Sequence, residues 1–110
     1  MMLKVTVLYG QPQDPAAFDK YYSEKHTPLV LKMPGLKGFT KGKSTTTDPN
    51  EKSPYYLIAN LYLDSIEAFQ VTMGSPEGQA AVADIPNFAS GGVTILLSEE
   101  QVVIPISLTK

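Results

Sequence analysis

The chain is short, weakly acidic and free of cysteine. Its 110 residues suffice for one core, so we expect a single domain over residues 1–110. Hydrophobic residues make up 43% of the chain, yet no run approaches the roughly 20 apolar residues of a membrane span, so no membrane partner is expected. The absence of cysteine excludes disulfides, thiol nucleophiles and thiolate metal sites. The first residues lack a signal-peptide pattern, which makes the cytoplasm the expected location.

The charged residues argue against a nucleic-acid partner. The net charge is −2, and all nine basic residues are lysines. Arginine, whose planar guanidinium clamps phosphates and guanine edges, is absent. The lysines are scattered and form no basic stripe, so no binding to nucleic acid is expected.

The chain begins with a predicted strand and helix. Leu3–Tyr9 alternates between apolar and polar side chains, which predicts a half-buried strand. Asp14 followed by Pro15 is typical of an N-cap and a first helical residue, because proline has no N–H to leave unpaired. A helix is therefore predicted over residues 15–25.

His26, the only histidine, lies where this helix should be interrupted. Phe18, Tyr22 and His26 are spaced by four residues, so they fall on one helix face. Pro28 lacks an N–H and its ring crowds the carbonyl four residues back, so the helix should kink or restart there, with a second piece over residues 28–32. A titratable ring at the end of an apolar stripe is a candidate functional group.

Two strands of different character flank a polar loop in the middle of the chain. Residues 36–43 contain three lysines and two glycines, which suits an exposed edge strand. Residues 44–54 are polar and turn-rich, so a loop is predicted; the sequence leaves open whether it closes over a pocket. Tyr55–Leu63 alternates most clearly and is predicted to be a strand.

Two short helices follow. Asp64 is predicted to cap a helix that stops at Gly74, with Glu67 completing a capping box. Ser75–Pro76 is predicted to cap a second helix that runs to about residue 83.

The end of the chain combines a loop with apolar segments. Residues 84–92 are predicted to form a loop, so Asp84 and Asn87 are interpreted as turn residues. Residues 93–98 are predicted to form a central strand. The short apolar run 102–106, broken by a proline, is expected to exchange between two subunits.

The order of these elements, β-α-β-β-α-β, predicts an α+β ferredoxin-like fold with helices on one face of an antiparallel sheet. The strand residues expected to meet the helices are uniformly apolar: Leu3, Val5, Val7, Leu57, Ala59, Leu61, Val93, Ile95 and Leu97. The opposite face is mixed: Thr6, Leu8, Tyr56, Ile58, Asn60, Tyr62, Thr94 and Leu96. It is too apolar to face water, so we expect a second copy to cover it in a homodimer.

The sequence resembles the EthD family over nearly its whole length. The matching segments, in order, are TVLYG, DPAAFDKYYSEKHTPLVLKMPGL, YYLIANLYLDSIEAF and SPEGQAAVADIPNFASGG. The most specific motifs are YYxxxHxPL and SPEGQAAxAD with its NFA. The resemblance implies a dimeric α/β barrel built from two ferredoxin-like subunits, and a role beside an oxidising system in ether degradation. No GxGxxG follows a strand and no P-loop is present, so no nucleotide cofactor is expected.

These observations predict a protein that binds a small apolar organic molecule in catabolic oxidation of ethers or aromatic compounds, without a redox cofactor of its own. Whether it also transforms that molecule is left open. A carrier or partner of a separate oxygenase is one alternative. A haem-binding or haem-degrading barrel is another, because haem needs only one axial histidine. No metal site is expected, since one histidine without cysteine cannot supply the usual ligands.

The candidate site is centred on His26, which the resemblance assigns through YYxxxHxPL. Its predicted role is proton transfer; the alternative is a core histidine whose ring nitrogens are bonded to backbone. Asn60, in the middle of a strand, is expected to hold a ligand or a buried water, or to pair across the dimer. The tyrosine hydroxyls could orient a substrate, although such tyrosines are more often core or dimer-interface residues. The predicted substrate-binding residues are Tyr22, Asn60, Tyr62, Tyr56 and Thr6.

Overall fold

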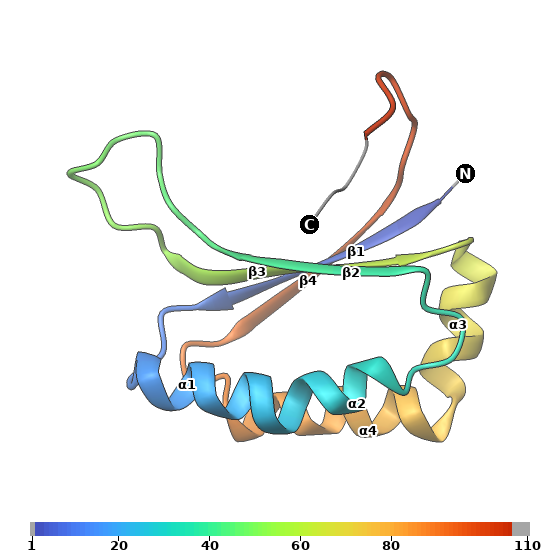
Figure 1. The fold of residues 1–110 in the computed structure, drawn as a ribbon, viewed down its shortest axis with the longest axis horizontal. Coiled ribbons are helices and arrows are strands. Elements are labelled where there is room, and N and C mark those ends of the chain that lie inside the picture. The colour runs from blue at the N-terminus through green and yellow to red at the C-terminus, as the bar shows by residue number, and fades with distance from the viewer. Residues whose placement is uncertain (1, 107–110) are drawn as a thin grey trace.

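The computed structural model describes residues 2–106, and within them four strands form one antiparallel sheet with helices on a single face (Figure 1). The strands are β1 (Leu3–Gly10), β2 (Gly38–Lys43), β3 (Tyr55–Leu63) and β4 (Val93–Glu99), in the spatial order β2-β3-β1-β4. The helical segments are α1 (Pro15–Tyr21), η1 (Tyr22–His26), α2 (Thr27–Leu31), α3 (Ile66–Gly74), α4 (Pro76–Asp84) and η2 (Ile85–Asn87). The predicted ferredoxin-like fold is confirmed.

The alternation of apolar residues sets which sheet face meets the helices. Every second residue of β1 is buried, and the buried β1 positions Val5 and Val7 pair with Leu61 and Ala59 of β3. This face forms the core together with aromatic side chains from α1, η1 and the segment after α4. The predicted inward face of β1 and β3 is therefore correct.

Strand β4 lies at an edge of the sheet, so the prediction of a central strand is wrong. It pairs only with β1 among the described residues. Its helix-side residues Val93, Ile95 and Leu97 remain 39–46% exposed. The apolar composition of this segment suggested a neighbouring strand on each side of β4. The described part of the chain supplies only β1. The prediction that β2 is an edge strand is correct.

The first helix continues through Pro28 instead of breaking there. The segment η1 is a π-helix, in which the N–H of Thr27 donates to the carbonyl of Tyr22, five residues back. Proline crowds the carbonyl four residues before it, and the wider π turn relieves that conflict without ending the helix. As predicted, Phe18, Tyr22 and His26 share a buried face.

Side chains cap each helix that begins after a loop. The carboxylate of Asp14 accepts from the N–H of Ala17, as predicted for α1. Ser65, rather than the predicted Asp64, caps α3 by accepting from the N–H of Ala68. Ser75 caps α4, as predicted. Both Asp64 and Ser65 have a suitable side chain, so the sequence alone could not choose between them.

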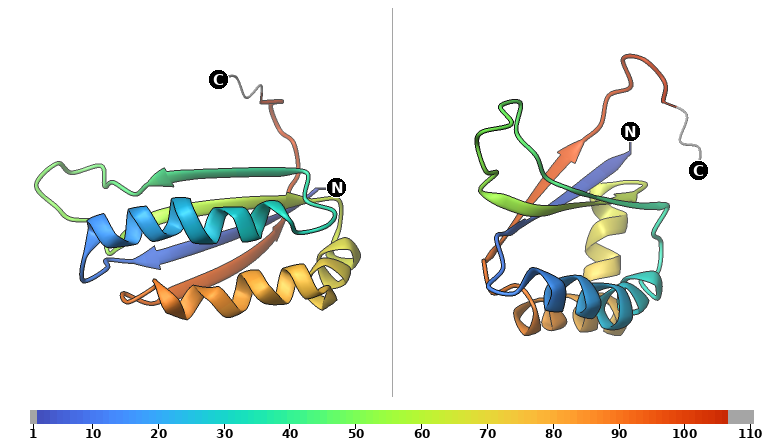
Figure 2. Two further views of the ribbon diagram at one scale, coloured as in Figure 1. Left: turned by 60° about the horizontal axis from the view of Figure 1, so that its bottom comes forward. Right: turned by 60° about the vertical axis from the view of Figure 1, so that its left-hand side comes forward.

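The other face of the sheet carries no helix within the described chain. The loop between β2 and β3 and the segment after β4 both project on this open side (Figures 1 and 2). The apolar residues at 102–106 form no strand, and Val102, Val103, Ile104 and Ile106 are between 71% and 87% exposed. None of the helices within residues 2–106 has both the length and the apolar character needed to cross a membrane.

A glycine in α4 permits the close packing of α3 against α4. A Cβ atom at Gly78 would overlap the backbone carbonyl oxygen of Thr72. We expect Gly78→Ala to lower the free energy of unfolding by about 1–3 kcal/mol, because backbone atoms must shift to admit the methyl group. Urea denaturation measures this change. Gly42→Ala, whose Cβ would meet nothing within 4 Å, is the matched control and should change stability by less than about 0.5 kcal/mol. Equal stabilities of the two variants would contradict the packing argument.

Candidate functional site

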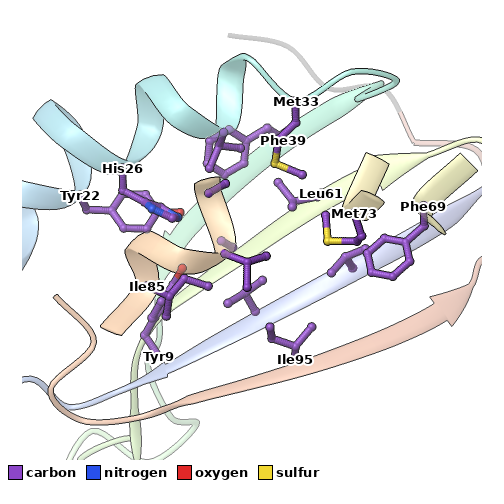
Figure 3. Close-up of a pocket in the computed structure, with 16 residues that line it drawn as sticks. Tyr9, Tyr22, His26, Met33, Phe39, Leu61, Phe69, Met73, Ile85 and Ile95 are labelled. Carbon is purple, nitrogen blue, oxygen red and sulfur yellow. The ribbon is translucent and has the colours of Figure 1, made fainter. Parts of the chain in front are cut away.

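A cavity lies between the sheet and the helices, with His26 at one end (Figure 3). Its volume is about 70 Å³, several times what a single water molecule needs. The lining residues come from β1, β2, β3, β4 and every α-helix except α1. They are Val5, Val7, Tyr9, Tyr22, His26, Val30, Met33, Phe39, Ala59, Leu61, Phe69, Met73, Ala81, Val82, Ile85 and Ile95. Only Tyr9, Tyr22 and His26 among these lining residues bring polar side-chain groups, so the cavity has one polar end and an apolar body.

His26 is held by a carboxylate that the sequence analysis interpreted as a turn residue. The Nδ1 atom of His26 lies 3.0 Å from Oδ2 of Asp84, and the two residues are 3% and 8% exposed. Asp84 is the last residue of α4, not part of a loop, and its side chain reaches His26 of η1. The alternative of a histidine bonded only to backbone is therefore wrong.

Three donors surround the Asp84 carboxylate. Besides His26, the Tyr21 hydroxyl donates to Oδ1 at 2.6 Å and the Asn87 amide donates to the same oxygen at 3.0 Å. Burial acts to raise the pKa of Asp84, but the hydrogen bonds from Tyr21, Asn87 and His26 outweigh it and hold this pKa below its usual value. The carboxylate is consequently ionised at neutral pH.

The environment of His26 favours a neutral imidazole. Burial lowers its pKa below 6.5, and the hydrogen bond and negative charge of Asp84 counteract burial only in part. Since Nδ1 faces an ionised carboxylate, the ring proton is assigned to Nδ1. The lone pair is then on Nε2, which makes this atom a proton acceptor at neutral pH.

Two tyrosine hydroxyls accompany the imidazole. Tyr9 and Tyr22 are both buried, and their rings pack edge-on with centroids 5.8 Å apart. Burial raises the pKa of Tyr22 to about 12, and burial together with the neighbouring Tyr22 raises the pKa of Tyr9. Both hydroxyls therefore keep their protons at neutral pH and can act as donors.

Aromatic packing fixes the orientation of these polar groups. The ring of Phe88 lies 4.7 Å from that of His26 and 5.5 Å from that of Tyr21, between centroids. The ring centroids of Tyr22 and His26 are 5.2 Å apart. Phe88 belongs to the NFA motif and was not predicted as a site residue. The signal that could have identified Phe88 was its position in the NFA motif, which the family resemblance had singled out.

Three of the predicted substrate-binding residues lie on the open face of the sheet, away from this cavity. Thr6 and Asn60 are direct partners across β1 and β3, and the Thr6 hydroxyl donates to the Asn60 side-chain oxygen at 2.9 Å. Tyr62 shares their face by strand alternation. The structure thus brings Tyr22 and His26 together and separates both from Thr6, Asn60 and Tyr62.

Tyr56 was assigned to the open face, and this placement is wrong. The register of β1 and β3 shifts between Tyr9 and Gly10, which leaves Tyr56 in an irregularity of the ladder. Its ring packs 5.3 Å from that of Phe18, and its hydroxyl donates to the carboxylate of Asp19 in α1 at about 3 Å. Tyr56 therefore contacts the first helix, outside the cavity that holds His26.

Metal and haem sites receive no support from these residues. No group of three or more His, Cys, Asp or Glu side chains capable of holding a metal ion occurs within residues 2–106. The cavity beside His26, at about 70 Å³, is far too small for a haem macrocycle. The residues around His26 therefore do not fit a haem group.

The chain belongs to the EthD family: the EthD domain model matches residues 10–92. A protein of Rhodococcus erythropolis, described as an uncharacterized 11.0 kDa protein in the thcB-thcC intergenic region, is 50% identical over 94% of this chain and 100% of its own length. The crystal structure of an EthD family protein from Bacillus halodurans superposes with a TM-score of 0.85, at 37% identity over 92% of this chain and 100% of that one.

More distant solved structures share the fold. A dimeric ferredoxin-like protein from Thermobifida fusca matches with a TM-score of 0.66 at 16% identity, over 89% of this chain and 90% of its own. SnoaB from Streptomyces nogalater, a cofactor-independent oxygenase, matches with a TM-score of 0.66 at 12% identity, over 96% of this chain and 97% of its own.

The single histidine allows a direct test of the buried pair. We expect NMR titration of the His26 imidazole to give a pKa below 6.5, and Asp84→Asn to lower it further, because the carboxylate is the group that counteracts burial. Asp64→Asn, which removes an exposed carboxylate, is the control and should leave the His26 pKa unchanged. A wild-type pKa at or above 6.5 would contradict the assignment of a neutral ring.

The same shift predicts how stability depends on pH. Because the pKa of His26 is lower in the folded than in the unfolded chain, the unfolded chain binds more protons below about pH 6.5. His26 therefore contributes stability above that pH, and the contribution decreases as the pH falls toward the folded pKa. Urea denaturation at pH 7 and pH 5 should show a larger loss for wild type than for His26→Gln. An equal loss in both proteins would argue against this linkage.

Proposed function

We propose that the cavity binds a small, mostly apolar organic molecule and that His26 accepts a proton from it. The observation that carries this proposal is the neutral imidazole of His26, fixed by Asp84 at the one polar end of an otherwise apolar cavity. A base in such a place can remove a proton from a bound molecule while water is largely excluded.

The arrangement of His26 and Asp84 suits proton transfer. When Nε2 takes up a proton, the imidazolium lies 3.0 Å from an ionised carboxylate, which stabilises the new charge. Asp84 in turn keeps its charge through Tyr21 and Asn87. This chemistry requires no redox group from the chain itself.

The size of the cavity limits the ligand, and its walls allow some adjustment. Drug-sized ligands occupy pockets of roughly 300–1,000 Å³, so a ligand of this chain must be smaller or must widen the cavity. Met33 and Met73 line it, and the unbranched methionine side chain repacks easily. Membership of the EthD family and the likeness to SnoaB support a role in the oxidative metabolism of small organic compounds, which we place in the cytoplasm.

Methionine methyl groups report on occupation of the cavity. With ¹³C-methyl methionine, we expect small cyclic hydrocarbons, ethers or ketones to shift the signals of Met33 and Met73 but not that of the exposed Met2. Ala81→Leu should weaken these shifts at least tenfold in apparent affinity, because its side chain enters the cavity. Ala80→Leu, a substitution at the exposed neighbouring residue, should leave the shifts unchanged.

Shifts that survive Ala81→Leu would place the ligand elsewhere. Binding that survives His26→Gln without any proton transfer in wild type would favour a carrier.

We also propose that the protein acts as a homodimer in which the open sheet faces of two copies pack together into an α/β barrel. The face bears Leu8, Ile58 and Leu96, and a surface of this kind is typical of an interface. The exposed apolar residues at 102–106 project on the same side and need cover as well. The dimeric protein of Thermobifida fusca with this fold supports the proposal.

A charge on the open face should break such a dimer. Leu96 is 53% exposed on β4, and Leu96→Lys would place an ammonium group between the two sheets. We expect light scattering to report a dimer for wild type and a monomer for Leu96→Lys. Leu31→Lys, on the exposed side of α2, is the control and should stay dimeric. A wild-type monomer at micromolar concentration would refute the proposed assembly.

A further inference from the structure

Tyr22 and His26 place one hydrogen-bond donor and one proton acceptor side by side at the polar end of the cavity. They are four residues apart in the first helix, and their rings are 5.2 Å apart between centroids. Figure 3 shows both side chains reaching the same end of the cavity, opposite the end formed by Phe69 and Met73. A molecule in the cavity can therefore meet both groups at once.

Tyr9 lies beside Tyr22 at the polar end of the cavity. Their rings are edge-on and 5.8 Å apart between centroids, and both side chains are buried and line the cavity. Tyr9 therefore restricts the orientation of the Tyr22 ring. It acts as a positioning residue for Tyr22.

We propose that the cavity is built for an enolisable carbonyl compound with an apolar body, whose oxygen accepts from the Tyr22 hydroxyl while Nε2 of His26 removes a proton from the adjacent carbon. This inference rests on the proposed function and names its substrate class. A pair of this kind matches the two sites of charge change in enolisation, because the carbon loses a proton as the oxygen becomes negative.

The proposed step is balanced without any further reagent. The Cα–H bond breaks and an N–H bond forms at Nε2. The electron pair of the broken bond forms the C=C bond, and the carbonyl π electrons move to oxygen, where the Tyr22 hydroxyl stabilises the enolate. Return of the proton to the same carbon gives exchange, and return to a conjugated carbon gives isomerisation.

The charges around the cavity favour a neutral substrate. No lysine within residues 2–106 lines the cavity, and Asp84 brings a negative charge next to His26. Lys41 lies over the ring of Tyr22, with its Nζ 5.1 Å from the centroid, but it is exposed and outside the lining. A carboxylate would enter an apolar space without a cation to pair with, which is costly, whereas a ketone needs only one donor.

Exchange of α-hydrogens for deuterium tests the proposal directly. Cyclohexanone and 2-indanone would be incubated with the protein in D₂O near neutral pH, and loss of the α-proton signals would be followed by NMR. We expect wild type to accelerate exchange above the buffer rate and His26→Gln to abolish the acceleration. Tyr22→Phe, which removes only the hydroxyl, should slow exchange by about 10²-fold while ketone still shifts the Met33 and Met73 methyl signals.

Further variants separate the roles. Tyr9→Phe should slow exchange by less than Tyr22→Phe, and it also serves if Tyr22→Phe fails to fold. Tyr55→Phe removes a hydroxyl outside the cavity lining and is the matched control, with exchange unchanged. Exchange that is equally fast in wild type and in Tyr22→Phe would overturn the role of Tyr22.

The outcomes distinguish this inference from the proposed function. If neither ketones nor hydrocarbons shift the Met33 and Met73 signals, the cavity binds no such ligand and the proposed function fails. If hydrocarbons bind but ketones do not, or if ketones bind without faster exchange, the cavity is a binding site and the enolisation step is wrong.

Discussion

The hydrogen bond between His26 and Asp84 is the interaction on which the site depends. It joins η1 in the first helix to the last residue of α4, and so ties the two helices that cover the sheet. Burying a carboxylate is costly unless donors replace water, and here Tyr21, Asn87 and His26 supply them. The same arrangement decides the protonation of the pair, because three donors keep Asp84 ionised while burial keeps His26 neutral.

The π-helical turn explains how the first helix can present two polar groups to one cavity. Pro28 would interrupt an α-helix, yet the wider turn at η1 absorbs the conflict, so Tyr22 and His26 stay in one continuous helix. Single π turns of this type occur often at functional sites, since they are tolerated where the surrounding packing compensates for them. Here the compensation comes from aromatic rings: Phe18 stacks on Tyr22, and Phe88 packs edge-on against it.

Local patterns in the sequence predicted the fold and one member of the pair formed by His26 and Asp84. The alternation in β1 and β3 identified the buried face, and spacing by four placed Tyr22 and His26 together. Asp84 could not be found this way, because it lies 58 residues from His26 and meets it only when α4 docks on η1. The segment DIPN, which begins at Asp84, has the composition of a turn. Local propensity therefore gave no indication that the Asp84 carboxylate is buried. Tyr56 was misplaced for a related reason, since a register shift in a ladder has no clear mark in one strand.

The position of the cavity relative to the open sheet face shows that ligand entry and the proposed dimer do not compete. Val82 on α4 and Ile95 on β4 line the cavity and are each 46% exposed, so the cavity reaches the surface between these two elements. This rim lies on the helix side of the sheet, whereas Thr6, Asn60 and Leu96 lie on the opposite side. The proposed dimer accounts for the mixed character of the sheet face, and the proposed proton transfer accounts for the polar end of the cavity. Because the sheet separates the two, a substitution on one side should leave the function of the other intact.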